Sequence, residues 1–534
     1  MAALFFVFCL SVFCILRGRL HTFITGSTGS GKSNTVYTIL DEAMRNDCKF
    51  MVIEPAKGEY KHVLGLRPDV SVYGTNPNIT PLLKLDPFSF PADIHVLEHM
   101  DRLVEIFNVC WPMYAAMPAV LKNAIERSYE DCGWELSASR NEYDNRLFPT
   151  FADVVRNVRK IIDSSEYDSE NKGAYKGSLI TRLESLSNGI NGMIFNSNQI
   201  SDSKLFDQNV IVDLSRVGST ETKSLLMGIL ILKLQEYRMT SSKINADLNH
   251  ITVLEEAHNI LKRTSTEQNP EIGNLAGKSV EMLSNAIAEM RTYGEGFIIA
   301  DQAPGLLDMS VIRNTNTKII MRLPENEDRE TAGKAAGMNE EQIAELAKLP
   351  CGVAAVYQNE WIQPVLCKVK KFSAPDTHYS MPASANEAQN AVMVARMRIA
   401  SFLGAERPPE FKLKELDNAG LTSSAKVMLL QSQHYGNKIG ERVRSSIVCS
   451  LFPELVRKLN TFYSGYNDVT GIEQITRQYF ERYRQDYTEY LNNMTGRPLG
   501  RTLLDSCYSE MIGLIVQSWN IENHIHFDSK TQTM

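Results

Sequence analysis

Residues 26–33 read GSTGSGKS, and this stretch decides the fold of the chain. It satisfies the pattern G-x-x-x-x-G-K-[ST] at every fixed position. Its glycines have no side chain, so the backbone N–H groups of the loop can approach phosphates closely. An apolar run, HTFITG, leads into the loop, and a helical pattern, SNTVYTILDEAM, follows it. A strand, a glycine-rich turn and a helix in this order predict a loop that binds the phosphates of a nucleotide.

Individual residues of this loop have distinct expected roles. Lys32 is expected to reach the β- and γ-phosphates, and Ser33 to place its hydroxyl on Mg²⁺. The following helix adds the positive end of its dipole. ATP and Mg²⁺ are therefore the expected cofactors. The predicted nucleotide-binding residues are Gly26, Ser27, Thr28, Gly29, Ser30, Gly31, Lys32, Ser33 and Asn34.

Further strand-like runs lie on both sides of a long helical stretch. Together with 21–26, they occupy 50–54, 210–214, 251–255, 297–301 and 318–323. Their apolar character is nearly continuous, which is typical of strands buried on both faces of a parallel sheet. Helical patterns separate them, so the fold class is α/β, a core with a central parallel sheet. Two last runs, 352–358 and 361–369, predict a hairpin.

The same pass along the chain predicts its domain organisation. The strands at the start and in the middle belong to one ATPase core that a helical insertion interrupts, and a helical domain follows the core. The expected parts are an apolar N-terminal segment at 1–19, the first part of the core at 20–80, the helical insertion at 81–207, the second part of the core at 208–372 and a helical C-terminal domain at 380–534.

The N-terminal segment contains an apolar run at 2–16, AALFFVFCLSVFCIL. This run is shorter than the roughly 18 residues that a membrane-spanning helix needs. It also lacks the basic start and the small-residue cleavage site of a signal peptide. A short membrane anchor stays open as an alternative. The favoured interpretation is a buried strand or a non-native start to a longer protein.

Composition places few limits on function but excludes some classes. The formal net charge is -7, which argues against a generally basic coat for nucleic acid but not against a local basic channel. The nine cysteines form no CxxC pair, so neither a zinc knuckle nor a disulfide framework is indicated. Reduced thiols in a cytoplasmic protein are the expected state.

Two acidic residues follow the strand-like run ITVL. Glu255 and Glu256 would stand at the carboxyl end of a strand, where ligands bind in open α/β sheets. Glu255 is expected to hold the Mg²⁺ shell, and Glu256 to polarise the attacking water as a general base. Paired acids after a strand often form only a solvated turn, but the phosphate-binding loop upstream favours the catalytic role.

Polar residues near two later strands complete the predicted site. Gln302 follows the run FIIAD and is expected to sense the γ-phosphate or its water. Arg291, Arg313 and Arg322 lie near the same strands, and an arginine can stabilise charge in the transition state of phosphoryl transfer. One of them would act within the subunit and another across a subunit boundary. Each alone could also be an ordinary surface ion pair.

The motifs, taken in order, resemble a known family. GSTGSGKSNT, IEPAKGEY, LEEAHNIL, AEMRTYGEGFIIADQ and NTNTKIIMRL are similar to the core of the HerA-type ATPases, the DUF87 group of the FtsK–HerA superfamily. The resemblance runs from about 20 to 370. It implies a RecA-like core, hexameric rings and DNA translocation. It also implies that Glu256 is the catalytic glutamate and that Arg291 faces a nucleotide.

The chain departs from this family at three points. HerA proteins carry a small β-barrel before the phosphate-binding loop, whereas only about twenty apolar residues precede it here. The second-strand motif usually starts with an aspartate, and here Glu54 stands at that place. An arginine often precedes the first-strand histidine, but this chain has Leu20 there, with Arg19 one position earlier. A role in trans at that position is therefore in doubt.

Residues that contact DNA are not evident. Lys368, Lys370 and Lys371 form a small basic cluster, which is more typical of a solvated strand end. Tyrosines recur at helical spacing in the C-terminal part. Bases could stack on their rings, but a helix that packs an aromatic face is the simpler interpretation. These tyrosines are Tyr479, Tyr483, Tyr487 and Tyr490.

The sequence thus predicts an ATP-driven motor on double-stranded DNA. The expected partners are further copies of the chain in a hexamer and a nuclease or another defence effector. A membrane partner is not expected. Two alternatives remain. One is an ATPase of type IV secretion or conjugation, for which the apolar N-terminal run is the specific support. The other is a regulatory ATPase that scaffolds an effector as a ring.

Overall fold

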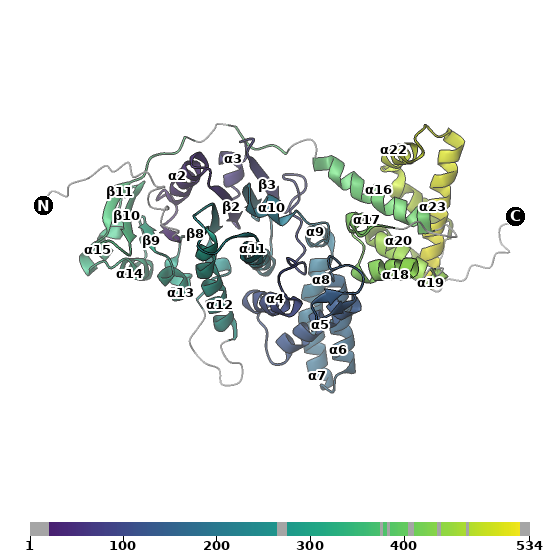
Figure 1. The fold of residues 1–534 in the computed structure, drawn as a ribbon, viewed down its shortest axis with the longest axis horizontal. Helices are drawn as coiled ribbons and strands as arrows, with labels where there is room; N and C mark the ends of the chain where they lie inside the picture. Colours follow the sequence, from purple (N-terminus) through teal and green to yellow (C-terminus); the bar gives the residue numbers. More distant parts are fainter. Residues whose placement is uncertain are drawn as a thin grey trace. The chain divides into compact units, whose positions relative to one another are not determined.

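The computed structural model describes residues 21–263, 275–373, 377–381, 385–403, 411–434, 439–465 and 469–523 (Figure 1). The chain forms two compact units. The first is drawn from 1–123, 164–194 and 199–381, and the second from 124–163, 195–198 and 382–534. The predictions for the N-terminal segment, 1–19, lie outside the described residues.

A nine-stranded sheet forms the centre of the first unit, in the order β11-β10-β9-β1-β8-β7-β2-β6-β3. In this order, each pair of neighbouring strands between β9 and β3 is parallel. Strand β10 pairs antiparallel with β11 and with β9. The strands are β1 (Thr22–Thr25), β2 (Lys49–Glu54), β3 (Val70–Gly74), β6 (Asn209–Asp213), β7 (His250–Glu255), β8 (Glu295–Asp301), β9 (Thr317–Ile320), β10 (Val353–Gln358) and β11 (Val365–Lys368).

The central strands are buried along their whole length, as their continuous apolar character predicts. On one face, Ile24 and Val52 share a core with Val36 and Leu40 of α2 (Lys32–Arg45). The other layer of helices contains α4 (Val96–Cys110), α11 (Thr220–Ser241) and α12 (Leu275–Met290), as Figure 1 shows. Nearly every side chain of α11 is apolar or buried, because this helix lies under other elements rather than at the surface.

Shorter helices complete the first unit. They are α3 (Tyr60–Val63), α7 (Ser169–Tyr175), the π-helix η1 (Lys176–Ile180), α8 (Thr181–Ser187), α9 (Gly189–Ile194), α10 (Asp202–Phe206), α13 (Met309–Arg313), α14 (Asn326–Ala335) and α15 (Glu340–Glu345), with 3-10 turns η2 (Ala257–Asn259), η3 (Arg291–Tyr293), η4 (Pro304–Leu306) and η5 (Leu346–Lys348).

The predicted α/β class, with a RecA-like core and a parallel sheet, is confirmed, and so is the hairpin. Within this sheet the prediction missed one strand, β3, which lies at the edge of the sheet beside β6. Its residues, VSVYG, alternate between buried and half-buried positions, so the run lacks the continuous apolar pattern of the central strands. Strand β9 also ends at Ile320, earlier than expected, which leaves Arg322 in the loop that follows.

The second unit is helical apart from one small hairpin, β4 (Trp134–Glu135) with β5 (Arg140–Asn141). Trp519, Phe480 and Leu455 lie in its apolar core. Its helices are α6 (Phe151–Ser164), α16 (Ala385–Leu403), α17 (Leu413–Asn418), α18 (Ser423–His434), α19 (Glu441–Leu451), α20 (Pro453–Gly465), α21 (Val469–Glu481), α22 (Arg484–Thr495) and α23 (Arg501–Glu522); α5 (Met117–Asp131) begins in the first unit and ends here.

Part of the predicted insertion at 81–207 belongs to this second unit rather than to a separate body. Polar contacts join it to α18. Lys426 Nζ donates to Ser197 Oγ at 2.8 Å, and Gln431 Nε2 donates to Tyr143 Oη at 2.8 Å. Residues 124–163 therefore pack with helices that follow them by more than two hundred positions in the sequence, which no local pattern could reveal.

The tyrosines of the C-terminal part pack inside the second unit. Tyr479, Tyr483 and Tyr487 belong to its apolar core. Arg482 lies over the ring of Tyr483, 4.5 Å from the centroid, and Tyr487 Oη shares a hydrogen bond with Ser401 Oγ at 2.6 Å. These rings stabilise the helices, so the packing interpretation is supported over base stacking.

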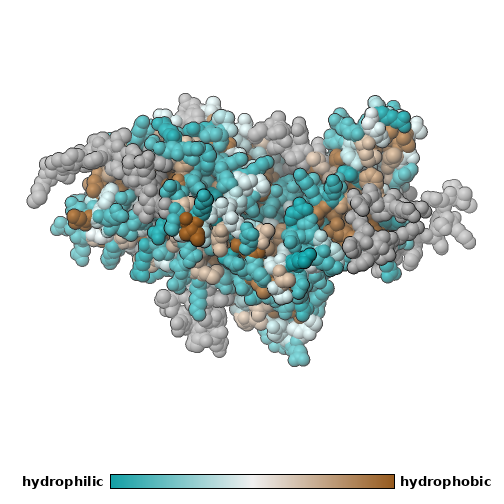
Figure 2. All heavy atoms as spheres, viewed as in Figure 1, coloured by the Kyte–Doolittle hydropathy of each residue, from teal (hydrophilic) through white to brown (hydrophobic). Residues whose placement is uncertain are grey.

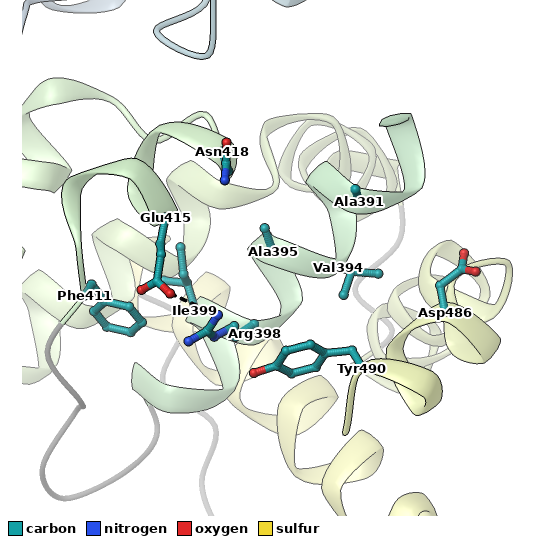
Figure 3. A pocket seen from close by; sticks show the side chains of 10 residues that line it. All are labelled: Ala391, Val394, Ala395, Arg398, Ile399, Phe411, Glu415, Asn418, Asp486 and Tyr490. Atoms are coloured by element: carbon teal, nitrogen blue, oxygen red, sulfur yellow. Dashed lines mark ion pairs between the residues drawn. The ribbon is translucent and has the colours of Figure 1, made fainter. Parts of the chain in front are cut away.

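A hollow of about 450 Å³ also lies in the second unit, between α16, α17 and α22 (Figure 3). Ala395 and Ile399 form part of its wall, and Arg398 pairs with Glu415 at 3.2 Å inside it. Neither a glycine-rich loop nor an acidic pair at a strand end lines this hollow. It is therefore separate from the predicted nucleotide site, although it is the more spacious cavity.

Hydrophilic residues predominate on the face shown in Figure 2, with apolar residues in small groups. None of the helices that the structure describes combines the length and the apolar character that a bilayer crossing requires.

Candidate active site

The glycine-rich loop joins β1 to α2 at the carboxyl edge of the sheet. Gly31, the residue before the helix, has φ 106°, a conformation that side chains rarely adopt. A Cβ at this position would also lie 3.0 Å from Met321 Cε and 3.3 Å from the backbone nitrogen of Gly352. The loop can keep this shape only with glycine, and the first turn of α2 then directs its N–H groups outward at the position where phosphates bind.

Neighbouring strand ends hold the loop in place. Ser27 donates from its backbone N–H and from its hydroxyl to the carbonyl oxygen of Arg322, at 2.9 and 3.0 Å. On the other side, Gly352 N–H donates to the carbonyl oxygen of Ser30 at 2.9 Å. The segments after β9 and before β10 therefore support the loop through backbone bonds, so its shape is built before any ligand arrives.

Lys32 and Glu255 form a buried ion pair beside the loop. Lys32 Nζ donates to Glu255 Oε2 at 2.6 Å and lies 3.7 Å from Glu256 Oε1. Burial alone would lower the pKa of Lys32, but the charges of Glu255, Glu256 and Asp301, together with the hydrogen bond to Glu255, outweigh burial and the pKa is raised. Lys32 is therefore a stable cation, and the structure brings together the loop lysine and both predicted acids.

Glu256 lies at a strained backbone position directly after β7. Its φ is 46°, in the left-handed region, and the strain turns its side chain back toward the loop. Gln302 Nε2 donates to Glu256 Oε1, and Thr28 Oγ1 donates to Gln302 Oε1 at 2.8 Å. A continuous chain of hydrogen bonds thus joins the loop, the predicted sensor and the predicted general base.

Asp301 and His258 belong to the same edge, although the sequence analysis did not select them. Asp301 is completely buried and accepts from the backbone N–H of His258 at 2.9 Å and from that of Ala303 at 2.9 Å. Its carboxylate also lies 2.9 Å from His258 Nδ1, and this hydrogen bond raises the pKa of His258. Asp301 therefore fixes the turns that carry Glu256 and Gln302. The sequence signal that could have identified Asp301 was its place as an acidic residue at the end of the buried strand FIIAD.

The second-strand motif supplies two more residues that the sequence analysis did not assign to the site. Tyr60 Oη donates to Glu255 Oε1 at 2.5 Å. Glu54, at the end of β2, accepts from the backbone N–H groups of Glu59 at 2.7 Å and Tyr60 at 3.2 Å. Burial raises the pKa of Glu54 to about 8. The sequence signal that could have identified Glu54 and Tyr60 was their place in the motif IEPAKGEY.

Three other predicted residues, Asn34, Arg322 and Arg313, differ in how near they lie to the loop. Asn34 uses its amide to tie α2 to the chain beyond β11: it donates to the carbonyl of Lys370 at 2.9 Å and accepts from the N–H of Phe372 at 2.7 Å. Its side chain therefore serves the fold. Arg322 is half-buried beside the loop, and its carbonyl binds Ser27. Arg313 is exposed at the end of α13.

Arg291 stands at the opposite edge of the sheet. It is exposed and precedes β8, which runs parallel to β1 with Thr22 opposite Ile298. Its neighbour is His21, at the start of β1: burial lowers the pKa of His21 to about 4, and the charge of Arg291 adds to that lowering. The phosphate-binding loop follows the other end of β1. The structure therefore does not bring Arg291 to the loop of its own chain.

The residues present fit a magnesium ion. One hollow at this edge is lined by the loop lysine, by Ser33 and by several carboxylates, and hydroxyl and carboxylate oxygens are the ligands that Mg²⁺ prefers. Ser33 and Glu255 are the residues that would hold the ion together with nucleotide phosphates. The lining residues are Lys32, Ser33, Glu54, Ala56, Lys57, Glu59, Tyr60, Glu255 and Glu256.

Comparison with known proteins gives a family model and several curated relatives. The family model "Helicase HerA, central domain" (DUF87) matches residues 19–234. The curated protein "DNA double-strand break repair helicase HerA" of Sulfurisphaera tokodaii is 24% identical over 356 residues, which cover 66% of this chain and 65% of the relative. The match therefore spans slightly less than two thirds of that relative's length.

Two solved structures are similar to this chain at low sequence identity. VirB4 of Thermoanaerobacter pseudethanolicus is 16% identical, with 66% of this chain and 90% of that chain covered and a TM-score of 0.49. The plasmid coupling protein TrwB, in complex with ADP and Mg²⁺, is 13% identical, with 68% and 88% covered and a TM-score of 0.46. Residues 19–234 match the central domain of the HerA-type (DUF87) ATPases, and the ordered motifs that the sheet brings together at one edge are similar to those of that family.

Proposed function

We propose that this chain is an ATP-hydrolysing ring motor that translocates double-stranded DNA, with a nuclease or another effector as its partner. One observation carries the proposal: a hydrogen-bonded series links Thr28, Gln302 and Glu256 at the carboxyl edge, beside the Lys32–Glu255 pair. Such a series can report the state of the γ-phosphate to a neighbouring element, which a motor needs and a static nucleotide-binding protein does not. The relatives named as repair helicases support DNA as the substrate.

Each residue at this edge has a proposed chemical role. Lys32 binds the β- and γ-phosphates as a point charge. Glu256 accepts a proton from the attacking water, and Gln302 orients that water and senses its loss. Ser33 and Glu255 would hold Mg²⁺, which would supply positive charge to the phosphate oxygens.

The position of Arg291 favours a ring in which sites are shared between subunits. An exposed arginine at the amino edge cannot serve its own loop, but it can face the nucleotide of a neighbouring copy. Arg322, half-buried beside the loop, is the candidate for a role within the subunit. We therefore propose that Arg291 acts in trans and Arg322 in cis.

ATPase measurements with and without linear duplex DNA test the proposal. The motor predicts stimulation by duplex DNA, and mixing Lys32→Ala subunits into the wild type should depress activity more than in proportion. Arg313→Ala is the matched control for Arg291→Ala, because both side chains are exposed and Arg313 has no proposed role. A rate that ignores DNA would favour the regulatory ATPase, and a linear dose response with a monomeric mass in Mg-ATP would contradict the ring.

A further inference from the structure

The carboxylate of Glu255 is held from two sides. Among the residues that the structure describes, Lys32 donates to one oxygen at 2.6 Å and Tyr60 to the other at 2.5 Å. The two donors differ in what a nucleotide does to them. Lys32 must engage the β- and γ-phosphates when ATP binds, so it shares or loses its bond to Glu255. Tyr60 has no phosphate to bind, because its hydroxyl is already directed at the carboxylate.

The surrounding loop holds Tyr60 rigidly. The side chain of Glu54 accepts from the N–H of Tyr60, and the ring of Tyr37 packs edge-on against the ring of Tyr60 with centroids 4.9 Å apart. Gly58, with φ +69°, makes the preceding turn; a Cβ there would lie 2.7 Å from Lys61 Nζ. Tyr60 itself is 2% exposed. Its hydroxyl therefore has little freedom to move away from Glu255.

We propose that Tyr60 is the positioning residue for Glu255, and that its hydroxyl keeps this carboxylate in place for Mg²⁺ once ATP has engaged Lys32. The inference rests on the proposed function. It also explains why the second-strand motif carries an aromatic residue with a hydroxyl: a phenylalanine would fill the same space but donate nothing.

The experiment compares Tyr60→Phe with Tyr37→Phe in the full chain. Both substitutions keep the ring and remove one hydroxyl from the same aromatic pair, but only the first removes a donor to Glu255. The readout is binding of a fluorescent, non-hydrolysable ATP analogue as Mg²⁺ is titrated. Tyr60→Phe should raise the half-saturating Mg²⁺ concentration about tenfold, the scale of one hydrogen bond to a charged group. Tyr37→Phe should stay within about twofold of the wild type, because the Tyr37 hydroxyl bonds to Glu59 and not to Glu255.

Two further measurements separate positioning from folding. In EDTA, Tyr60→Phe should bind the analogue as the wild type does, because the loop and Lys32 are intact. In a Glu255→Gln background, Tyr60→Phe should have no further effect on Mg²⁺ dependence, because the carboxylate that it holds is gone. An unchanged Mg²⁺ dependence in Tyr60→Phe, or an equal shift in both tyrosine variants, overturns the inference. Failure of the proposed function gives a different result: ATP turnover by the wild type would ignore duplex DNA, while the two tyrosine variants would still differ in their Mg²⁺ dependence.

Discussion

One cluster of buried charged side chains lies at the amino ends of the strands, here called the amino edge, and another lies at their carboxyl ends, the carboxyl edge. The two clusters differ in exposure and in backbone conformation. At the amino edge, Glu295 accepts from Arg238 Nε, His250 Nδ1 and Thr252 Oγ1, each at 2.8 Å. All four residues are almost completely buried. At the carboxyl edge, Lys32 and Glu255 are equally buried, but Thr28 is exposed and Ser33 and Gln302 are half-buried.

Backbone conformation separates the two clusters as well. Glu256 has φ 46°, whereas His250 and Glu295 begin regular strands. The amino-edge cluster is closed and unstrained, so it serves stability. The carboxyl-edge cluster is open to solvent on one side and strained, as is typical of a functional site. Buried charge alone therefore does not identify an active site; access and strain do.

The largest effect is expected for Lys32→Ala. The phosphates lose their point charge, so ATP turnover should fall by about a thousandfold or more. The fold should persist, because the glycine-rich loop is held by backbone bonds. Steady-state ATPase rates and thermal unfolding measure the two properties. Near-normal hydrolysis in this variant would remove the functional distinction between the two edges.

Glu256→Gln should slow hydrolysis at least about a hundredfold, the scale of a lost general base. It should still bind the nucleotide, since Lys32 and the loop remain. Single-turnover rates and binding of a fluorescent nucleotide give both numbers. If Glu255→Gln proves the slower variant while Glu256→Gln stays active, the two roles are reversed.

Glu295→Gln should act on the fold instead. The change leaves Arg238 and His250 buried beside a neutral amide, which should cost about 2–3 kcal/mol in the free energy of unfolding. The ATPase rate per folded molecule should not change, because the substitution lies at the other edge. Denaturant unfolding and active-site titration check these outcomes. A loss of rate without a loss of stability would mean that the amino edge takes part in the chemistry.

The smallest effect concerns pH. The pKa of Glu54 is raised from 4.5 to about 8, so its folded-state contribution is present at low pH and is lost as the pH rises through about 8. Burial would raise the pKa of Glu295, but the charges of His250 and Arg238 lower it to about 2. The contribution of Glu295 to the free energy of unfolding is therefore constant above about pH 4.5. From pH 6 to 8 the wild type should lose about 2 kcal/mol, and Glu54→Gln should lose less. Equal slopes in the two proteins would show that Glu54 is ionised throughout.

Much of the site was predictable because its residues follow recognisable strands. The glycine-rich loop, Glu255, Glu256 and Gln302 each come directly after a continuous apolar run, and the carboxyl ends of parallel strands meet at one edge. The bonds of Tyr60 and Asp301 were not predictable. Both depend on which strands become neighbours, and β2 lies beside β7 although about two hundred residues separate them. Arg291 precedes β8, and the parallel pairing of β8 with β1 places it at the amino edge, away from the loop of its own chain.

The sequence by itself determined the α/β class, the phosphate-binding loop and the acidic pair, because these features depend on local pattern and on residue chemistry. The tertiary structure alone decided that Tyr60 shares Glu255 with Lys32, that 124–163 packs with the C-terminal helices, and that Arg291 lies away from its own loop. These outcomes follow from strand order and from packing between distant segments. Such contacts form between residues that have no fixed separation in the sequence, so only the folded chain brings them together.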